Sequence, residues 1–169
     1  MFFVDERCVP PGDPRSNYGM ARSALLSKVP IPDAQVFRIR GEQGGPAAAG
    51  AYARAITRAV GTRPRFDLVL LGLGEDGHAA SLFPGSAALE ENALPVVPVP
   101  GAPPRVTLTL PVLNAAGSVL FLVSGRAKSR VLQAVLSGRS SLPAARIRPE
   151  RGRQLWMVDR AAASRLSVR

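Results

Sequence analysis

The sequence contains very few of the residues that build disulfides and metal centres. Cys8 is its only cysteine and His78 its only histidine. A lone cysteine excludes an internal disulfide, and these two residues are too small a set for a structural zinc site. No apolar run reaches transmembrane length, and no charged start followed by an apolar stretch marks a signal peptide. A soluble cytoplasmic protein with no membrane partner is expected.

Aromatic residues and lysines are also scarce. Aromatic residues make up 5% of the chain, so a core built mainly from Ala, Val and Leu is expected. Only two of the 22 basic residues are lysines, and the net charge is +10. The excess lies in residues 101–169, which hold twelve basic residues and two acidic ones. This excess of positive charge reflects either a codon bias toward arginine or a positive electrostatic field that attracts an anionic substrate. The scarcity of aromatic residues and the lack of a recognised binding motif argue against nucleic-acid binding.

The stretch from residue 67 to residue 85 organises the chain. Residues 67–71 form an almost fully apolar run, typical of a strand buried on both faces inside a parallel sheet. Three glycines, two carboxylates and the only histidine follow at once, and residues 79–83 predict a short helix that Pro84 ends. Open α/β sheets bind ligands beyond the carboxyl ends of their strands. The sequence therefore predicts a site here.

Two nucleotide-binding motifs match this loop only superficially. Gly72, Gly74 and Gly77 have the spacing of the dinucleotide fingerprint, but Glu75 and Asp76 would repel a pyrophosphate. The Pro-rich segment that follows also lacks a clear crossover helix. The glycine spacing of a phosphate loop is present too, but a histidine stands where that motif requires lysine. A nucleotide site is not expected.

The complete string resembles the signature of the 6-phosphogluconolactonases, Gly-Leu-Gly-Glu-Asp-Gly-His followed by Ala-Ser-Leu-Phe-Pro-Gly. The resemblance implies hydrolysis of 6-phosphogluconolactone to 6-phosphogluconate in the oxidative pentose phosphate pathway, without a metal or organic cofactor. His78 would be the general base, kept neutral by the predicted helix start, and Asp76 would fix its tautomer. Backbone amides of the loop at Gly72, Gly74 and Gly77 would contact the substrate and receive the oxyanion.

Four further polar residues match the family's binding positions for a sugar phosphate. Arg7 ends an Asp-Glu-Arg motif, Asn17 lies in Ser-Asn-Tyr, Arg105 begins a predicted strand, and Lys128 lies near a predicted helix start. Each has an ordinary structural alternative. Arg7 could form a salt bridge with a neighbouring carboxylate, Asn17 could cap a helix, and the other two could be solvated surface charges.

Strands and helices alternate along the chain. Strands are expected over 1–5, 36–39, 67–71, 106–110, 119–123 and 155–158, and helices over 16–28, 46–60, 79–83 and 127–136, with a short one at the end. This order predicts a single α/β domain over residues 1–169. The expected fold is Rossmann-like, with a mostly parallel sheet and helices on both faces.

The family's Gly-Gly-x-Thr-Pro phosphate loop does not occur in this sequence. The resemblance therefore predicts a domain truncated at its N-terminus, with activity reduced or lost. Two other functions stay open at this stage. One is a glucosamine-6-phosphate deaminase or isomerase, although the Ile-Ala-Phe-Asn-Glu continuation typical of those enzymes is absent. The other is a sugar-phosphate-binding protein without catalysis. The oligomeric state is not predicted.

Overall fold

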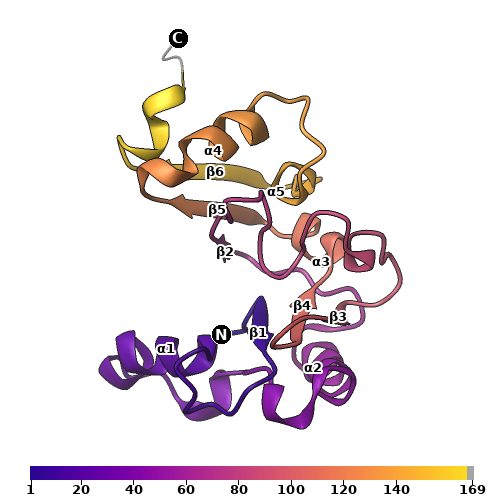
Figure 1. Cartoon of the computed structure of the whole chain (residues 1–169). Coiled ribbons are helices and arrows are strands. Elements are labelled where there is room, and N and C mark those ends of the chain that lie inside the picture. Colours follow the sequence, from indigo (N-terminus) through magenta and orange to yellow (C-terminus); the bar gives the residue numbers. More distant parts are fainter. Residues whose placement is uncertain (167–169) are drawn as a thin grey trace. The chain divides into compact units, whose positions relative to one another are not determined.

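The computed structural model describes residues 1–166, and the chain forms two compact units in it (Figure 1). The first unit contains Met1–Pro64 and Ala93–Leu108, and the second contains Arg65–Asn92 and Thr109–Arg169. The single domain expected from the sequence stays a prediction. None of the helices in the described part is long and apolar enough to cross a membrane.

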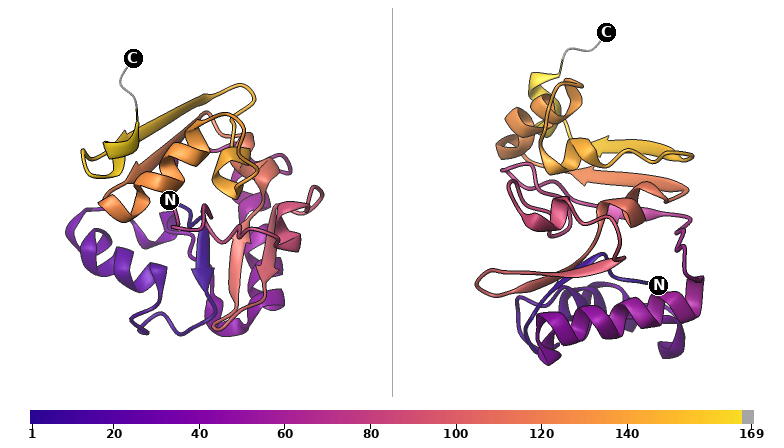
Figure 2. Two further views of the ribbon diagram at one scale, coloured as in Figure 1. Left: turned by 45° about the horizontal axis from the view of Figure 1, so that its top comes forward. Right: turned by 90° about the vertical axis from the view of Figure 1, so that its right-hand side faces the viewer.

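The first unit is built on an antiparallel sheet of order β1-β4-β3. Its strands are β1 (Asp5–Arg7), β3 (Val96–Val99) and β4 (Arg105–Leu108). Helix α2 (Gly45–Val60) packs against β3 and β4 (Figure 2). It buries Ala48, Ala49, Tyr52 and Ile56, a set with the spacing of one helix face. Helix α1 (Asn17–Ala24) contacts β1.

Three expectations for this unit are wrong. The first strand lies at β1, not over residues 1–5, because Phe2 makes only an isolated bridge to Phe37 and the ladder to β4 starts at Asp5. That single bridge also replaces the strand expected over 36–39. The helix expected over residues 16–28 is shorter, because α1 ends at Ala24 and the 3-10 helix Leu26–Lys28 follows it.

The second unit is built on a parallel sheet of order β2-β5-β6. Its strands are β2 (Val69–Leu71), β5 (Ser118–Val123) and β6 (Arg153–Val158). Its helices are α3 (Leu110–Asn114), α4 (Ser129–Leu136) and α5 (Pro143–Arg146). The rings of Phe121 and Trp156 stack with centroids 4.0 Å apart, which joins the two longest strands. Val131, Leu132 and Val135 of α4 are buried, with the spacing of one helix face.

The α/β class is confirmed, but the mostly parallel sheet is not. The strands divide between one antiparallel and one parallel sheet. The expected strand at 67–71 is present as β2, yet only one of its faces is buried, since Leu68 and Leu70 are 54% and 52% exposed. The remaining elements are short 3-10 helices at Leu26–Lys28, Asp33–Gln35, Gly41–Gln43, Ala87–Leu89, Arg126–Lys128 and Ala162–Arg165.

Candidate active site

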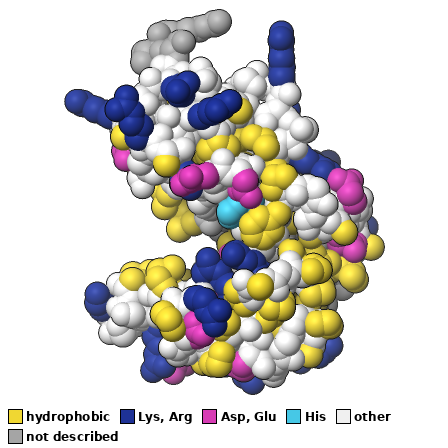
Figure 3. Space-filling model, viewed as in Figure 1, with side chains coloured by type: hydrophobic (Ala, Val, Ile, Leu, Met, Phe, Trp, Pro, Cys, Tyr) yellow, Lys and Arg dark blue, Asp and Glu magenta, His cyan; other side chains and the backbone are white. Residues whose placement is uncertain are grey.

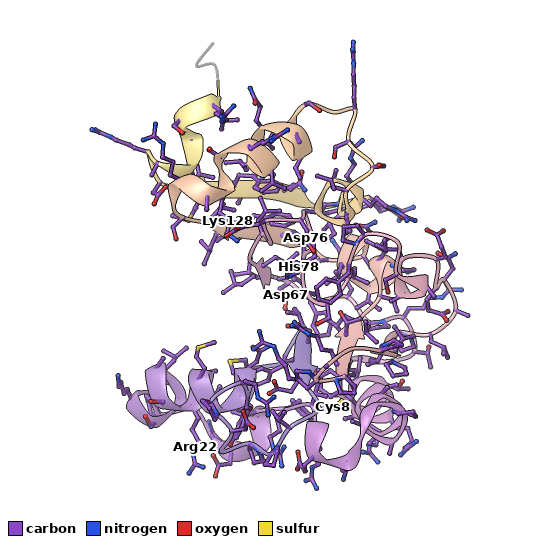
Figure 4. The ribbon with its side chains drawn as sticks, viewed as in Figure 1. Cys8, Arg22, Asp67, Asp76, His78 and Lys128 are labelled. Carbon is purple, nitrogen blue, oxygen red and sulfur yellow. The ribbon has the colours of Figure 1, made fainter. Side chains whose placement is uncertain are left out.

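The second unit places a carboxylate against the only histidine. Nδ1 of His78 lies 2.6 Å from Oδ1 of Asp76, and the same oxygen accepts a hydrogen bond from the His78 backbone amide at 3.1 Å. The ring of Phe83 packs on the imidazole, with centroids 4.5 Å apart. Figures 3 and 4 show the histidine at the surface beside acidic side chains. The sequence spacing of two therefore does bring the predicted catalytic pair into contact.

The electrostatics of the pair settle which imidazole nitrogen is free. Partial burial alone would raise the pKa of Asp76, but hydrogen bonds from the backbone and ring of His78 outweigh it and hold that pKa below its usual value. The carboxylate is therefore ionised at neutral pH and can only accept. Nδ1 of a neutral imidazole must then carry the proton, which leaves Nε2 as a lone-pair acceptor.

Two of the three loop glycines are required by the space around them. A Cβ on Gly74 would lie 2.0 Å from Nδ1 of His78, so any side chain there displaces the imidazole. Gly77 has φ +85°, and a Cβ on it would meet Leu142 at 2.8 Å. A Cβ on Gly72 would meet nothing within 4 Å. Gly72 is thus the one member of the motif that this packing does not explain.

The loop holds its shape through its own backbone. The amide of Gly74 donates to the carbonyl of His78 at 2.8 Å, and the amide of Gly77 donates to the carbonyl of Gly74 at 3.1 Å. The amide of Ala144 ties the loop to α5 by donating to the Gly77 carbonyl at 3.0 Å. Since the Gly74 and Gly77 amides are engaged inside the loop, they are not open donors for an oxyanion.

The helix expected over residues 79–83 does not form. Ala79 and Leu82 make an antiparallel bridge around a turn in which Ala80 has φ +52°, a left-handed conformation that a helix excludes. Both bridge residues are fully buried, so core packing fixes the turn. The prediction that a helix start keeps His78 neutral is therefore wrong. The contact with Asp76 still orients the ring, as expected.

Lys128 also belongs to the second unit. It ends the 3-10 helix Arg126–Lys128, just before α4, as predicted. Its Nζ lies 3.7 Å from Oε1 of Glu75, and the side chains are 25% and 68% exposed respectively. A pair this long and this exposed contributes little to stability. The ammonium group therefore remains available to an anion bound near the loop.

The first unit collects the other predicted residues. Arg7 makes no salt bridge to its neighbouring carboxylates within the described residues; its Nη1 donates to Oδ1 of Asn17 at 2.6 Å and to the Arg15 carbonyl at 2.9 Å. Asn17 does not cap α1, because the hydroxyl of Ser16 accepts from the Gly19 amide and does so instead. The side-chain Nδ2 of Asn17 donates to the carbonyl and to Oδ1 of Asp5, so the Asn17 side chain bridges Asp5 and Arg7.

Arg105 lies directly opposite Arg7 in the antiparallel pairing of β1 and β4. Directly opposed residues share a face of the sheet, and like charges in that position destabilise it. A bound anion would offset this repulsion. The sequence suggested each arginine separately but could not predict the pairing, because β1 and β4 are separated by almost 100 residues. Glu6, the residue before Arg7, is buried, which no pattern in the sequence indicates.

Metal ligands do not gather in either unit: no group of three or more His, Cys, Asp or Glu side chains in the described residues could hold an ion. The described side chains could supply a general base, the His78 imidazole in contact with Asp76, and arginine and lysine cations for an anionic ligand.

The chain is similar in sequence and in structure to proteins named 6-phosphogluconolactonase. The rat 6-phosphogluconolactonase is 49% identical over 173 residues, covering 98% of this chain and 67% of the relative. The Arabidopsis thaliana 6-phosphogluconolactonase 3, chloroplastic, is 37% identical and covers 98% of this chain and 55% of the relative. The 6-phosphogluconolactonase structure from Trypanosoma brucei matches with a TM-score of 0.85 and 33% identity, covering 98% and 73% of the two chains.

The family model described as glucosamine-6-phosphate isomerases/6-phosphogluconolactonase matches residues 1–156, which include every residue of the candidate site. The chain belongs to this family.

Proposed function

We propose that the protein hydrolyses 6-phospho-D-glucono-1,5-lactone to 6-phospho-D-gluconate, a step of the oxidative pentose phosphate pathway. The contact between Asp76 and His78 carries the proposal, because lactone hydrolysis needs one general base held in one tautomer. Relatives at up to 49% identity bear the name of this activity. The substrate is a small sugar phosphate, and neither nucleic acid nor a membrane is required.

The reaction begins at Nε2 of His78. This nitrogen takes a proton from water while the water oxygen attacks the lactone carbonyl carbon, giving a tetrahedral oxyanion. The carboxylate of Asp76 stabilises the imidazolium that forms and keeps Nδ1–H in place. Collapse of the intermediate breaks the bond to the ring oxygen, which receives the proton back from Nε2. The product acid then ionises and releases one proton to solvent.

Recognition of the phosphate is assigned to cations. Arg7, Arg105 and Lys128 supply positive charge, and Asn17 fixes the guanidinium of Arg7. Arginine suits this role because its planar fork matches two phosphate oxygens at once. Loss of Arg7 or Arg105 is expected to raise KM more than it lowers kcat. In a double-mutant cycle, the Arg7 and Arg105 substitutions should be non-additive if both contact one phosphate.

The test is turnover of the lactone above its spontaneous rate, monitored through the release of protons into a weak buffer. Hydrolysis that saturates with lactone supports the proposal. Ammonia release from glucosamine 6-phosphate without lactone hydrolysis would contradict it, and phosphosugar binding without turnover would reduce the protein to a binding role. A cytoplasmic location is proposed as well; the Arabidopsis relative is named chloroplastic, so fractionation of the source cells decides between compartments.

A further inference from the structure

Glu6 is a buried carboxylate with no catalytic assignment. It is 2% exposed, and its two oxygens accept four hydrogen bonds. The donors are the backbone amides of Arg7, Asn17 and Tyr18, at 2.7–2.8 Å, and the hydroxyl of Ser16, at 3.0 Å. Burying a charge in this way is costly unless it is fully hydrogen-bonded. Because both Glu6 oxygens are hydrogen-bonded, the burial of this carboxylate indicates a specific structural role in the first unit.

The donors identify what Glu6 fixes. Asn17 and Tyr18 are the first two residues of α1, whose amides have no partner within the helix. Glu6 accepts from both, and the Ser16 hydroxyl accepts from the third, that of Gly19. A carboxylate is also the charge that a helix N-terminus favours. Glu6 therefore locks the start of α1 to the β1 strand that carries Arg7.

The protein holds the guanidinium of Arg7 through Nη1 only. Both hydrogens of Nη1 are used, on Asn17 Oδ1 and on the Arg15 carbonyl. Nε, in contrast, is buried and has no hydrogen-bond partner among the described residues. An orphaned buried donor is costly, so it marks a place where a ligand is expected. The edge formed by Nε and Nη2 is one of the two forks through which arginine binds an oxyanion bidentately.

We propose that Glu6 is a positioning residue for the phosphate of the substrate. It holds Asn17 at the start of α1, Asn17 holds Nη1 of Arg7, and Nε is left without a protein partner, as a donor for a phosphate oxygen. The proposal rests on the phosphate role given to Arg7 above. It adds that this role depends on a carboxylate that never touches the ligand.

The experiment compares three variants of the full chain with inorganic phosphate as the probe. Glu6→Gln keeps the size of the side chain but replaces one acceptor by a donor. Asn17→Ala removes the contact with Arg7 while keeping the backbone amide that Glu6 binds, so it serves if Glu6→Gln does not fold. Tyr52→Phe is the matched control: it removes buried hydrogen bonds at Phe3 in the same unit without touching Arg7. Calorimetry gives the phosphate Kd, and lactone kinetics give KM and kcat separately.

Both Glu6→Gln and Asn17→Ala are expected to raise the phosphate Kd and KM about tenfold, the value of one charge-assisted contact, with kcat within about twofold. Tyr52→Phe should lower thermal stability and leave Kd and KM within about twofold. If the first two variants behave like Tyr52→Phe, Glu6 is only structural and the proposal is wrong. Because phosphate binding is read without turnover, this failure is distinct from an absence of lactone hydrolysis.

Discussion

Substituting Gly74 by alanine should disable the base while leaving the fold intact. The new Cβ would lie 2.0 Å from Nδ1 and 2.3 Å from Cε1 of His78, and 2.7 Å from Oδ1 of Asp76. Ordinary contact begins at 3.4 Å, so the imidazole must move by about 1.4 Å. A misplacement of about 1 Å can cost roughly a hundredfold in rate. We therefore expect kcat/KM for the lactone to fall about a hundredfold, or about 2.7 kcal/mol of transition-state stabilisation.

The stability of the same variant should change little. Gly74 is not among the glycines with positive φ, so alanine fits its backbone and gains about 0.4–1 kcal/mol through the unfolded chain. The His78 and Asp76 side chains are 30% and 50% exposed, so loss of their contact costs about 0.2–1 kcal/mol. These effects nearly cancel, and Tm should stay within about 4 °C.

Gly72→Ala is the control in the same loop, because its Cβ would meet nothing within 4 Å. Its loss of kcat/KM should be at most about fivefold, the size of a minor contact change. Lactone hydrolysis and thermal unfolding of both variants test the reasoning. If Gly74→Ala keeps more than a tenth of the wild-type activity, or if Gly72→Ala loses as much, steric control of the histidine is refuted.

The remaining predictions concern Asp76, Tyr52 and metal ions. Asp76→Asn should lower kcat about a hundredfold or more with KM nearly unchanged. Folding lowers the pKa of Asp76, so the ionised carboxylate stabilises the fold above the unfolded pKa of about 3.9, and this effect is lost as the pH falls through the folded pKa. The Tm of wild type should therefore exceed that of Asp76→Asn at neutral pH, and the difference should disappear in acid. A difference that grows in acid would contradict this. Tyr52→Phe should lower the free energy of unfolding by about 1–3 kcal/mol in urea, because the buried hydroxyl bonds both backbone groups of Phe3; an unchanged midpoint would argue against that role. A chelator should leave lactone hydrolysis unchanged, since the proposed steps need only His78 and Asp76, and a loss that added metal restores would contradict them.

The elements that the sequence predicted well are those with long, regular apolar patterns. Helix α2, helix α4 and strand β5 all appear near their expected bounds. Strand β3 was missed because it lies in a Pro-rich segment and contains Pro98. Proline is tolerated there because β3 is an edge strand paired only with β4. The composition of this segment does not predict a strand, because β3 forms only through its pairing with β4.

The candidate site also combines features that the sequence predicted with features that it did not. Asp76 and His78 are two residues apart, so their contact follows from local geometry and was predicted correctly. The turn after His78 was predicted as a helix, because the burial of Ala79 and Leu82 that fixes it is a property of the whole unit. The role of Glu6 depends on partners ten to twelve residues away, which no local pattern reveals.

The most direct test of the central claim is lactone hydrolysis by wild type and His78→Asn under identical conditions. Asparagine keeps a polar side chain at a half-buried position but cannot take a proton from water. We expect kcat to fall at least a hundredfold, within the range for loss of a general base, while the Kd for inorganic phosphate stays within about twofold. Undiminished hydrolysis by His78→Asn would remove the histidine from the mechanism and contradict the account.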